Sequence, residues 1–401
     1  MIEILRIQLL SWNPLILREA MKKTLIFCLV IILRIESFKP YIFNVDISKV
    51  VSPPFDTLNW TQEYELRQNP YNIINLTVPD MVTGTRGSYK ILKNWLGENV
   101  IKRYDKDIIV IVKQIFTHNK ERFQRYGIIS LANIMDITPH EMTFKEYVDE
   151  RMSVMESLNA NLEPIFLVVN DGGFYRMIKR EVVKLSEVYR FEEPSGVTNI
   201  VYFLEDEEKI DKIKKSLENA GCVVADGHHR LQAARNLYDK THDEFWLNTL
   251  AYITSIYDDG LMIGGVHRLI KSNATIESLS GCMNLEPSKT IENGRSYLYN
   301  GSLYSINTKD MIPVEFTNDI IIKKCLEMDY NDMLRNVGYA YDVSQAISNV
   351  DSKKYDFAII VPEWKREDFI KISMEKRMLP QKSTYFYPKI PSGIVIHLKP
   401  L

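Results

Sequence analysis

Residues 222–231 read CVVADGHHRL, and this is the most informative stretch of the chain. Its first three residues are apolar and predict a buried strand. Apolar residues at 231, 234 and 238 have the spacing of one helix face. An acid, a glycine, two histidines and an arginine therefore share one strand-to-helix turn. Helix N-termini attract anions, because the first N–H groups have no partner inside the helix.

Two interpretations of this turn follow from the residues alone. In the first, the backbone around Gly227 and the forked guanidinium of Arg230 hold a phosphate or a carboxylate. In the second, Asp226 caps an ordinary helix, Gly227 makes the turn, and the histidines and the arginine are solvated. We favour the first, because four of the seven histidines lie in short charged motifs like this one.

Composition indicates the class of protein. The chain has 401 residues, of which 45% are hydrophobic and 25% charged, typical of a globular protein of two or three domains. A net charge of −2 does not favour a general nucleic-acid binder. The four cysteines lie far apart without a CxxC pair, so we expect neither a zinc site nor a disulfide framework, and a cytoplasmic location.

The first 34 residues form a separate N-terminal extension. Two lysines precede an apolar run from Leu25 to Leu33, which resembles a secretory signal but has no small-residue cleavage site. The run is also shorter than the roughly 20 residues that cross a bilayer. We expect that the start of the gene has been placed too far upstream. A signal or membrane anchor, and a genuine extra helix, are the alternatives.

The periodicity of the remaining chain predicts helices and strands in irregular order. We expect helices over 86–100, 144–158, 206–220 and 363–376, and strands over 73–78, 108–116, 125–132, 164–169, 247–256 and 355–361. This order predicts an α+β fold of mixed sheets and packed helices. The composition becomes looser after residue 275, so we expect a core domain over 35–275 and a C-terminal α+β region over 276–401.

Histidine is the side chain best suited to move protons near neutral pH. We therefore expect proton-moving catalytic residues among His140, Glu141, Asp226, His228 and His229. Each histidine has the alternative of an ordinary hydrogen-bonding role. Asp226 and Glu141 are also the candidates for Mg²⁺, which needs few carboxylates. The absence of HxxxH and HExxH motifs argues against a transition-metal site.

The triplet Lys382-Ser383-Thr384 can donate to phosphate oxygens, although no glycine-rich P-loop precedes it. A surface turn leading into an aromatic strand is the alternative. The chain has no G-x-S-x-G motif and no G-x-G-x-x-G after a strand, so a serine triad and Rossmann-type NAD binding are unsupported.

From about Ile35 onward the chain resembles domain-of-unknown-function family 1015 of bacteria and archaea. The resemblance rests on motifs in the family's order. They are 51–56 (VSPPFD, with Phe55 for the family's Tyr), 69–72 (NPYN), 140–143 (HEMT, with Met142 for Arg), 150–151 (Glu-Arg for Asp-Arg), Asn161 with 164–166 (PIF), 226–230 (DGHHR), 267–268 (HR) and 380–389 (PQKSTYFYPK).

The DGHHR turn is also similar to the phosphate-binding turn of the ParB/sulfiredoxin superfamily. That superfamily includes nucleotide-using partition proteins, sulfiredoxins and an archaeal kinase that acts on free serine. The similarity implies a ParB/sulfiredoxin-like core and a helix start that grips nucleotide phosphates.

Together these observations predict a cytoplasmic enzyme that binds ATP, ADP or CTP with Mg²⁺, or another phosphorylated compound. We expect phosphoryl transfer or hydrolysis on a small molecule, as in a kinase or phosphatase, and no nucleic-acid or membrane partner. We expect the C-terminal tail to fold back onto the pocket. The predicted phosphate-binding residues are Gly227, Arg230, Arg151, His267, Arg268, Lys382, Ser383 and Thr384. The alternatives are a non-catalytic nucleotide-binding regulator related to partition proteins, and a scaffold that binds no nucleotide.

Overall fold

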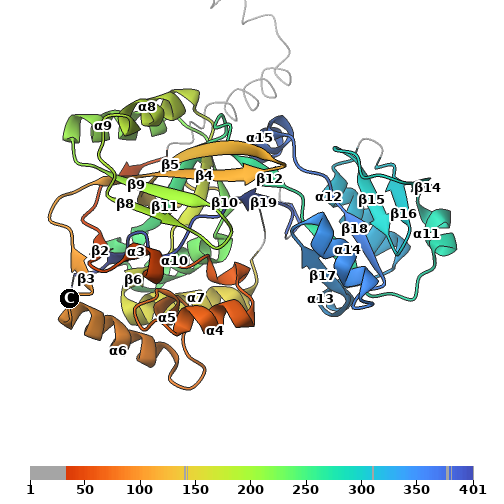
Figure 1. Cartoon of the computed structure of the whole chain (residues 1–401), viewed down its shortest axis with the longest axis horizontal. Coiled ribbons are helices and arrows are strands. Elements are labelled where there is room, and N and C mark those ends of the chain that lie inside the picture. The colour runs from red at the N-terminus through yellow and green to blue at the C-terminus, as the bar shows by residue number, and fades with distance from the viewer. Residues whose placement is uncertain are drawn as a thin grey trace, which may run out of the picture.

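The computed structural model describes residues 33–139, 141, 143–308, 311–375, 379–380 and 382–400, and these form two lobes (Figure 1). The predictions for residues 1–32 and for His140 lie outside the described residues. Within the described ranges, no helix combines the length and the apolar character that crossing a membrane requires.

The larger lobe is built around an eight-stranded sheet in the order β10-β7-β11-β5-β4-β9-β8, with β1 also pairing with β5. Strands β11 and β7 are parallel, whereas β4 and β5 form an antiparallel hairpin in which His118 is opposite Glu121. The bounds are β1 Ile35–Glu36, β4 Ile109–His118, β5 Glu121–Asn133, β7 Ile165–Val169, β8 Tyr189–Glu192, β9 Thr198–Leu204, β10 Cys222–Asp226 and β11 Asn248–Ser255.

Both faces of this sheet are buried, because side chains alternate between two cores along each strand. On β4, Ile109 and Ile111 belong to one core, and Val110 and Val112 belong to the other. The core of Ile109 is covered by helices on one face of the sheet. These are α7 Lys145–Leu158, α8 Gly172–Val182, α9 Glu207–Leu217 and α10 His228–Thr241.

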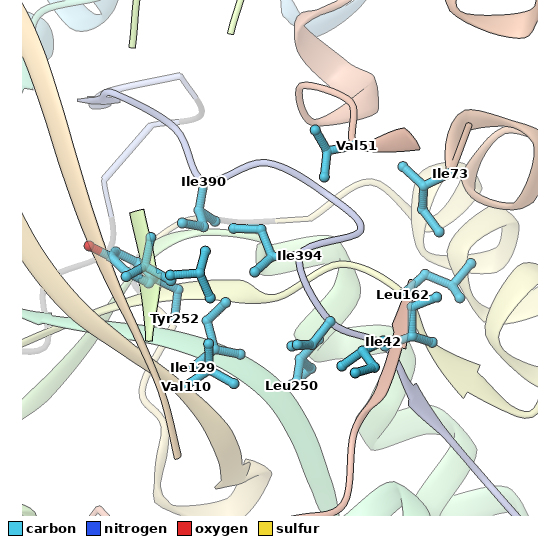
Figure 2. Packing of buried hydrophobic residues seen from close by; sticks show 14 of the residues in the cluster. Ile42, Val51, Ile73, Val110, Ile129, Leu162, Leu250, Tyr252, Ile390 and Ile394 are labelled. Atoms are coloured by element: carbon cyan, nitrogen blue, oxygen red, sulfur yellow. The ribbon is translucent and has the colours of Figure 1, made fainter. Parts of the chain in front are cut away.

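The opposite core, of Val110, is filled by segments from the two ends of the described chain. Figure 2 shows Ile390 and Ile394 lying between sheet residues such as Tyr252 and the N-terminal Val51 and Ile73. Short elements surround this core. They are β2 Tyr41–Phe43, α3 Ile47–Val50, α4 Trp60–Arg67, α5 Ile74–Thr77, α6 Gly84–Gly97, β3 Ile101–Arg103, β6 Ala160–Asn161 and β20 His397–Leu398.

The smaller lobe is a six-stranded antiparallel sheet in the order β14-β16-β15-β18-β13-β17. Its strands are β13 His267–Ile270, β14 Leu285–Ser288, β15 Ser296–Tyr299, β16 Leu303–Ile306, β17 Val337–Ala340 and β18 Phe357–Ile360. Its helical segments are α11 Ile276–Cys282, α12 Pro313–Glu315, the π-helix Phe316–Cys325, α13 Tyr330–Asn336 and α14 Val343–Asp351. The predicted α+β class is confirmed.

The chain then returns to the larger lobe. Helix α15 (Arg366–Met374) leads to β19 (Tyr385–Tyr387), which pairs with β12 (Met262–Gly264) between the lobes (Figure 1). The smaller lobe is therefore inserted into the larger one, and the C-terminal stretch passes the junction before it enters the core of Val110.

The predicted strand over 73–78 is wrong, because the chain forms the short helix α5 there. The Oδ1 atom of Asn72 accepts the N–H of Ile74 at 3.0 Å, and the Asn75 amide donates to the Asn69 carbonyl at 3.0 Å. Asparagine side chains that satisfy the backbone locally favour a turn or helix start over a strand.

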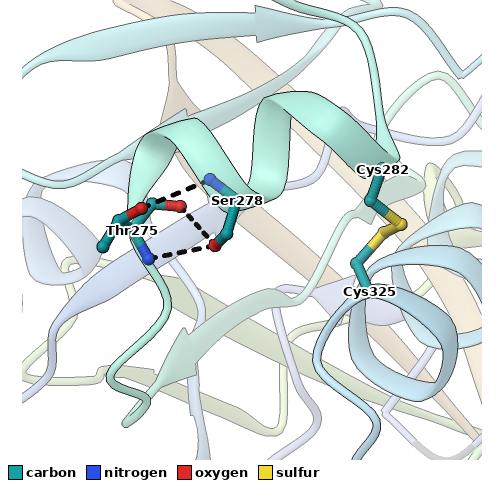
Figure 3. Close-up of a disulfide and its surroundings, with 4 residues drawn as sticks. All are labelled: Thr275, Ser278, Cys282 and Cys325. Carbon is teal, nitrogen blue, oxygen red and sulfur yellow. Dashed lines mark hydrogen bonds between the residues drawn. A yellow bond between two sulfur atoms is a disulfide. The ribbon is translucent and has the colours of Figure 1, made fainter.

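The sequence indicated no disulfide framework, but one disulfide joins Cys282 and Cys325 in the smaller lobe (Figure 3). The bond joins the end of α11, whose start is capped by Thr275 and Ser278, to the end of the π-helix. The two cysteines lie 43 residues apart, so only tertiary packing brings them together. Disulfides are rare in a reducing cytoplasm, so the cytoplasmic location stays a prediction.

Candidate functional site

The DGHHR turn joins β10 to α10 as predicted, with Gly227 as the residue before the helix. Gly227 has a φ of +92°, in the left-handed region that side chains rarely adopt. A Cβ atom at this position would also lie 2.9 Å from Cγ2 of Ile165. The turn therefore requires glycine, and it places Asp226 at the end of the strand beside the first turn of α10.

Asp226 is held by two cations. Its Oδ2 atom accepts from Nη2 of Arg230 at 2.9 Å, and its Oδ1 atom accepts from Nζ of Lys389 at 2.5 Å. Burial alone would raise the pKa of Asp226, but these two cations lower it below its usual value. The capped-helix interpretation is wrong, because Arg230 is buried and also donates to the carbonyl of Pro164 at 2.9 Å.

Glu141 is the second acid of the site and has the opposite shift. Burial raises its pKa to about 7, while the backbone N–H of Ser383 and the charge of Lys382 act against the rise. Its Oε1 atom accepts that N–H at 3.3 Å. A carboxyl that titrates near neutral pH can accept or donate a proton under physiological conditions.

The C-terminal tail contributes the remaining cations. The charge of Lys382 lowers the pKa of both Asp226 and Glu141, and its Nζ atom donates to the hydroxyl of Tyr341 at 3.3 Å. Nη1 of Arg268 donates to the carbonyl of Lys382 at 2.8 Å. The site thus gathers four cations around two acids, one of which is partly protonated at pH 7, so its net charge is positive.

Both lobes contribute to this arrangement. Asp226 and Glu141 belong to the larger lobe, Arg268 and Tyr341 to the smaller one, and Lys382 to the stretch that crosses between them. Junctions between domains are a common location for small-molecule sites. Each lobe alone would carry only part of the charge.

Lys389 is positioned by polar side chains on the sheet. Nε2 of Gln114 donates to the carbonyl of Lys389 at 3.1 Å and to Oδ1 of Asn199 at 3.0 Å. Nη2 of Arg125 donates to Oε1 of Gln114 and to the carbonyl of Pro388. These bonds fix the backbone on either side of the 388–389 peptide, so that the Lys389 side chain reaches Asp226.

Several of these residues were missed by the sequence predictions. Lys389 ends the quoted tail motif but was not assigned to the site. Gln114 and Arg125 are polar residues inside otherwise apolar strands, and they are completely buried. Polar residues at strand positions whose neighbours are apolar are a usable signal, because a buried polar group must find a partner.

Other predicted site residues lie in different surroundings. Nδ1 of His267 accepts the N–H of Val361 at 3.2 Å, and burial lowers the His267 pKa to about 4, so this ring is neutral. Arg151 donates to the carbonyl of Thr77 at 2.8 Å and lies 3.9 Å above the ring of Phe55. Both residues therefore make structural contacts with the surrounding backbone and side chains.

Arg151 and Arg230 line one small internal cavity of about 20 Å³. A space of this size holds about one water molecule rather than a ligand. Arg230 therefore stabilises Asp226 from the interior.

The hydroxyl of Ser383 donates to the carbonyl of Pro380 at 2.5 Å, and the residue is fully buried. Oγ1 of Thr384 is buried as well, without a hydrogen-bond partner among the described residues. His228 is half-buried at the first turn of α10. Nε2 of His229 accepts the N–H of Phe144 at 3.2 Å.

Asp226 does not fit Mg²⁺ in this arrangement, because both of its carboxylate oxygens accept from cations. Among the described residues, no group of three His, Cys, Asp or Glu side chains is placed to hold a metal ion. An anion suits the net positive charge of the site better than a cation does.

The hydrogen bonds that link Gln114 to Asn199 continue to a buried acid, Glu193, whose ionisation can be tested by its effect on stability. Glu193 accepts from the Asn199 amide at 2.7 Å, and burial raises its pKa from 4.5 to about 7. The folded protein therefore loses stability as the pH rises from 4.5 towards 7, because the unfolded chain releases this proton first. We expect Glu193→Gln to raise the free energy of unfolding by ~1–2 kcal/mol at pH 8.

Thermal unfolding at pH 4.5 and pH 8 measures this effect, with the exposed neighbour Glu192→Gln as the control. The gain from Glu193→Gln should be present at pH 8 and absent at pH 4.5. An equal change at both pH values would mean that ionisation of Glu193 is not the cause.

Comparison with solved structures gives only distant likenesses. A conserved hypothetical protein from Pyrococcus furiosus has a TM-score of 0.39 at 14% identity, covering 66% of this chain and 93% of that one. C-terminally truncated SbnI from Staphylococcus aureus has a TM-score of 0.41 at 11% identity, covering 66% and 85%. A free serine kinase in complex with AMP has a TM-score of 0.39 at 11% identity, covering 67% and 92%. Similarity at this level carries neither a fold assignment nor an activity.

No curated protein matches the chain significantly. The family comparison does give a result, because one family model matches residues 35–331. That range includes the NPYN motif, the DGHHR turn and His267-Arg268, and it spans most of the chain. The protein therefore belongs to the family described as "Protein of unknown function (DUF1015)".

Proposed function

We propose that this protein binds a phosphorylated small molecule at the junction of its lobes and catalyses phosphoryl transfer or hydrolysis there. The observation that carries the proposal is the gathering of Lys382, Lys389, Arg230 and Arg268 around two acids whose pKa values are shifted in opposite directions. Environments that shift the pKa values of two neighbouring carboxyl groups in opposite directions are typical of acid–base sites.

Phosphoryl transfer depends mainly on positioning and on neutralising charge, which suits a site rich in cations. In the proposal, Lys382 contacts the phosphate oxygens, because its charge acts on both acids and its Nζ atom lies at the junction, within 3.3 Å of the Tyr341 hydroxyl. The start of α10, with Gly227 and His228, adds N–H groups and the positive end of the helix dipole. Asp226 and Lys389 hold the turn and the tail together.

Glu141 has the role of the proton acceptor. Its pKa of about 7 allows it to take a proton from an attacking hydroxyl or water and to release that proton again. We do not assign this role to His229, because its Nε2 atom accepts a backbone N–H. The phosphorylated compound in the proposal is a nucleotide such as ATP, ADP or CTP, and the location is the cytoplasm.

Replacement of Lys382 tests the binding part of the proposal. We expect Lys382→Ala to weaken the binding of pyrophosphate and of ATP by about 10-fold or more. The variant loses a charge-assisted contact that contributes about 1–2 kcal/mol to the binding free energy. Ligand at about 100 Kd adds ~2.7 kcal/mol of stability, so thermal shifts and calorimetry both measure the effect. The control is the exposed Lys102→Ala on β3.

Equal affinity in both variants would contradict the assignment of Lys382. The absence of any shift in the native protein with ATP, ADP, CTP or pyrophosphate would remove the proposed function. Binding without phosphate release or transfer would favour a nucleotide-binding regulator that uses the same residues.

A further inference from the structure

We propose that Phe144, Tyr147, His229 and Tyr330, named here the aromatic cluster, form a subsite for the planar base of a nucleotide. This inference rests on the proposed function, in which the phosphates of the same ligand lie at Lys382. It names a part of the ligand that the phosphate site does not determine: a flat, aromatic heterocycle instead of a sugar, an amino acid or a plain polyphosphate.

The rings of the aromatic cluster contact one another in different orientations. Phe144 and His229 are nearly parallel, with centroids 6.5 Å apart and planes at 9°. Tyr147 meets the His229 ring edge-on at 5.4 Å and the Phe144 ring edge-on at 5.8 Å. The Tyr330 ring is tilted towards Phe144 at 6.3 Å.

The aromatic cluster is close to the phosphate site along the chain. Phe144 follows Glu141 by three residues, and His229 follows Asp226 by three residues. The hydrogen bond from the Phe144 N–H to His229 Nε2 ties these two segments together. In the proposal, a ligand with its phosphate at the acids and cations extends over these rings.

The two lobes meet at the aromatic cluster. Phe144, Tyr147 and His229 belong to the larger lobe, and Tyr330 begins α13 of the smaller lobe. The acids and cations of the phosphate site come from both lobes in the same way. A base held at these rings would thus contact both lobes, as would its phosphates.

The exposure of the rings in the aromatic cluster favours a ligand-binding role over a role in core packing. Tyr147 is 55% exposed and Tyr330 is 59% exposed, whereas core aromatic residues such as Tyr252 and Phe166 are at most 1% exposed. Large exposed aromatic side chains grouped together mark binding surfaces. Aromatic rings stack on nucleobases of every kind, because each base has a π-face.

A comparison of two ligands separates the base from the phosphates. Isothermal titration with ATP and with inorganic tripolyphosphate, in the same buffer, gives both affinities for the native protein. We expect ATP to bind more tightly. We expect Tyr330→Ala and Tyr147→Ala to weaken the binding of ATP by about 5- to 100-fold and to leave the affinity for tripolyphosphate unchanged.

The conservative variants Tyr330→Phe and Tyr147→Phe should retain ATP affinity, since stacking needs the ring rather than the hydroxyl. Tyr64→Ala is the control, because Tyr64 is 56% exposed and stacks on Trp60 in α4 instead. Unfolding midpoints of all variants identify any loss of folding.

The outcomes distinguish the two proposals. If the native protein binds ATP and tripolyphosphate equally and the alanine variants change neither, the subsite is overturned while the phosphate site stands. If the affinity for ATP falls only in Lys382→Ala and not in the tyrosine variants, the subsite is likewise overturned. If neither ligand binds the native protein, the proposed function fails and the inference fails with it.

Discussion

Asp226→Asn should lose about 3–5 kcal/mol of unfolding free energy, the range for removing one partner of a buried ion pair. The side chains of Asp226, Arg230 and Lys389 are only 20%, 11% and 14% exposed. Removal of the carboxylate leaves two cations poorly solvated and without a counter-charge. Urea unfolding at pH 7 measures the loss, and a loss under 1 kcal/mol would contradict this account.

A double-mutant cycle with Lys389→Met assigns the effect to the pair. Lys389→Met alone should cost less, because Asp226 keeps its bond to Arg230. We expect a coupling energy of about 1–3 kcal/mol between the two substitutions. Additive losses would mean that Lys389 does not stabilise Asp226.

The pH dependence has a defined sign. The pKa of Asp226 in the folded protein lies below its ordinary value of 3.8. Its contribution to stability is therefore present above that value and is lost as the pH falls through the lower, folded-state pKa. The difference between the native protein and Asp226→Asn should accordingly shrink in acid.

Glu141→Gln should lower the rate of phosphoryl transfer or hydrolysis by about 10²–10⁴-fold, the usual contribution of a general acid or base. Binding of pyrophosphate should be unchanged or tighter, because a partly negative side chain is removed from an anion site. Initial rates of phosphate release from ATP between pH 5.5 and 8.5 provide the measurement. The rate of the native protein should rise through about pH 7 as Glu141 loses its proton.

The control for this experiment is Ser383→Ala, which keeps the backbone N–H that Glu141 accepts. Its pH profile should match that of the native protein. The same inflection near pH 7 in Glu141→Gln would show that another group titrates. A fall in pyrophosphate affinity equal to the fall in rate would assign Glu141 to binding.

Local patterns in the sequence predicted most of the secondary structure. The DGHHR turn was predicted as a strand followed by a helix because its apolar spacing changes within a few residues, and the structure has β10 and α10 there. Helix α5 was missed, because it depends on a hydrogen bond that the Asn72 side chain accepts and one that the Asn75 side chain donates, rather than on periodicity. The ParB/sulfiredoxin-like core and the domain boundary after residue 275 stay predictions.

The candidate site was less accessible to sequence reasoning. The charged motifs identified Asp226, Arg230, Glu141 and Lys382, since ionisable groups in short clusters are visible without a fold. The partners of these groups depend on tertiary contacts over long separations, such as the sequence separation of 163 between Asp226 and Lys389. The Cys282–Cys325 bond was missed for the same reason.

The position of Ile390 and Ile394 has a consequence for biosynthesis. These residues complete a core whose other walls are contributed by Val51, Ile73 and the central strands (Figure 2). The ribosome synthesises residues 390–394 after every other segment of this core except residues 395–398, so the larger lobe lacks part of its core until these residues emerge. Late closure of a distant contact slows folding and prolongs the exposure of apolar surface. The inserted smaller lobe, which has its own core, can fold earlier, whereas the larger lobe completes its core only after residues 390–394 have been synthesised.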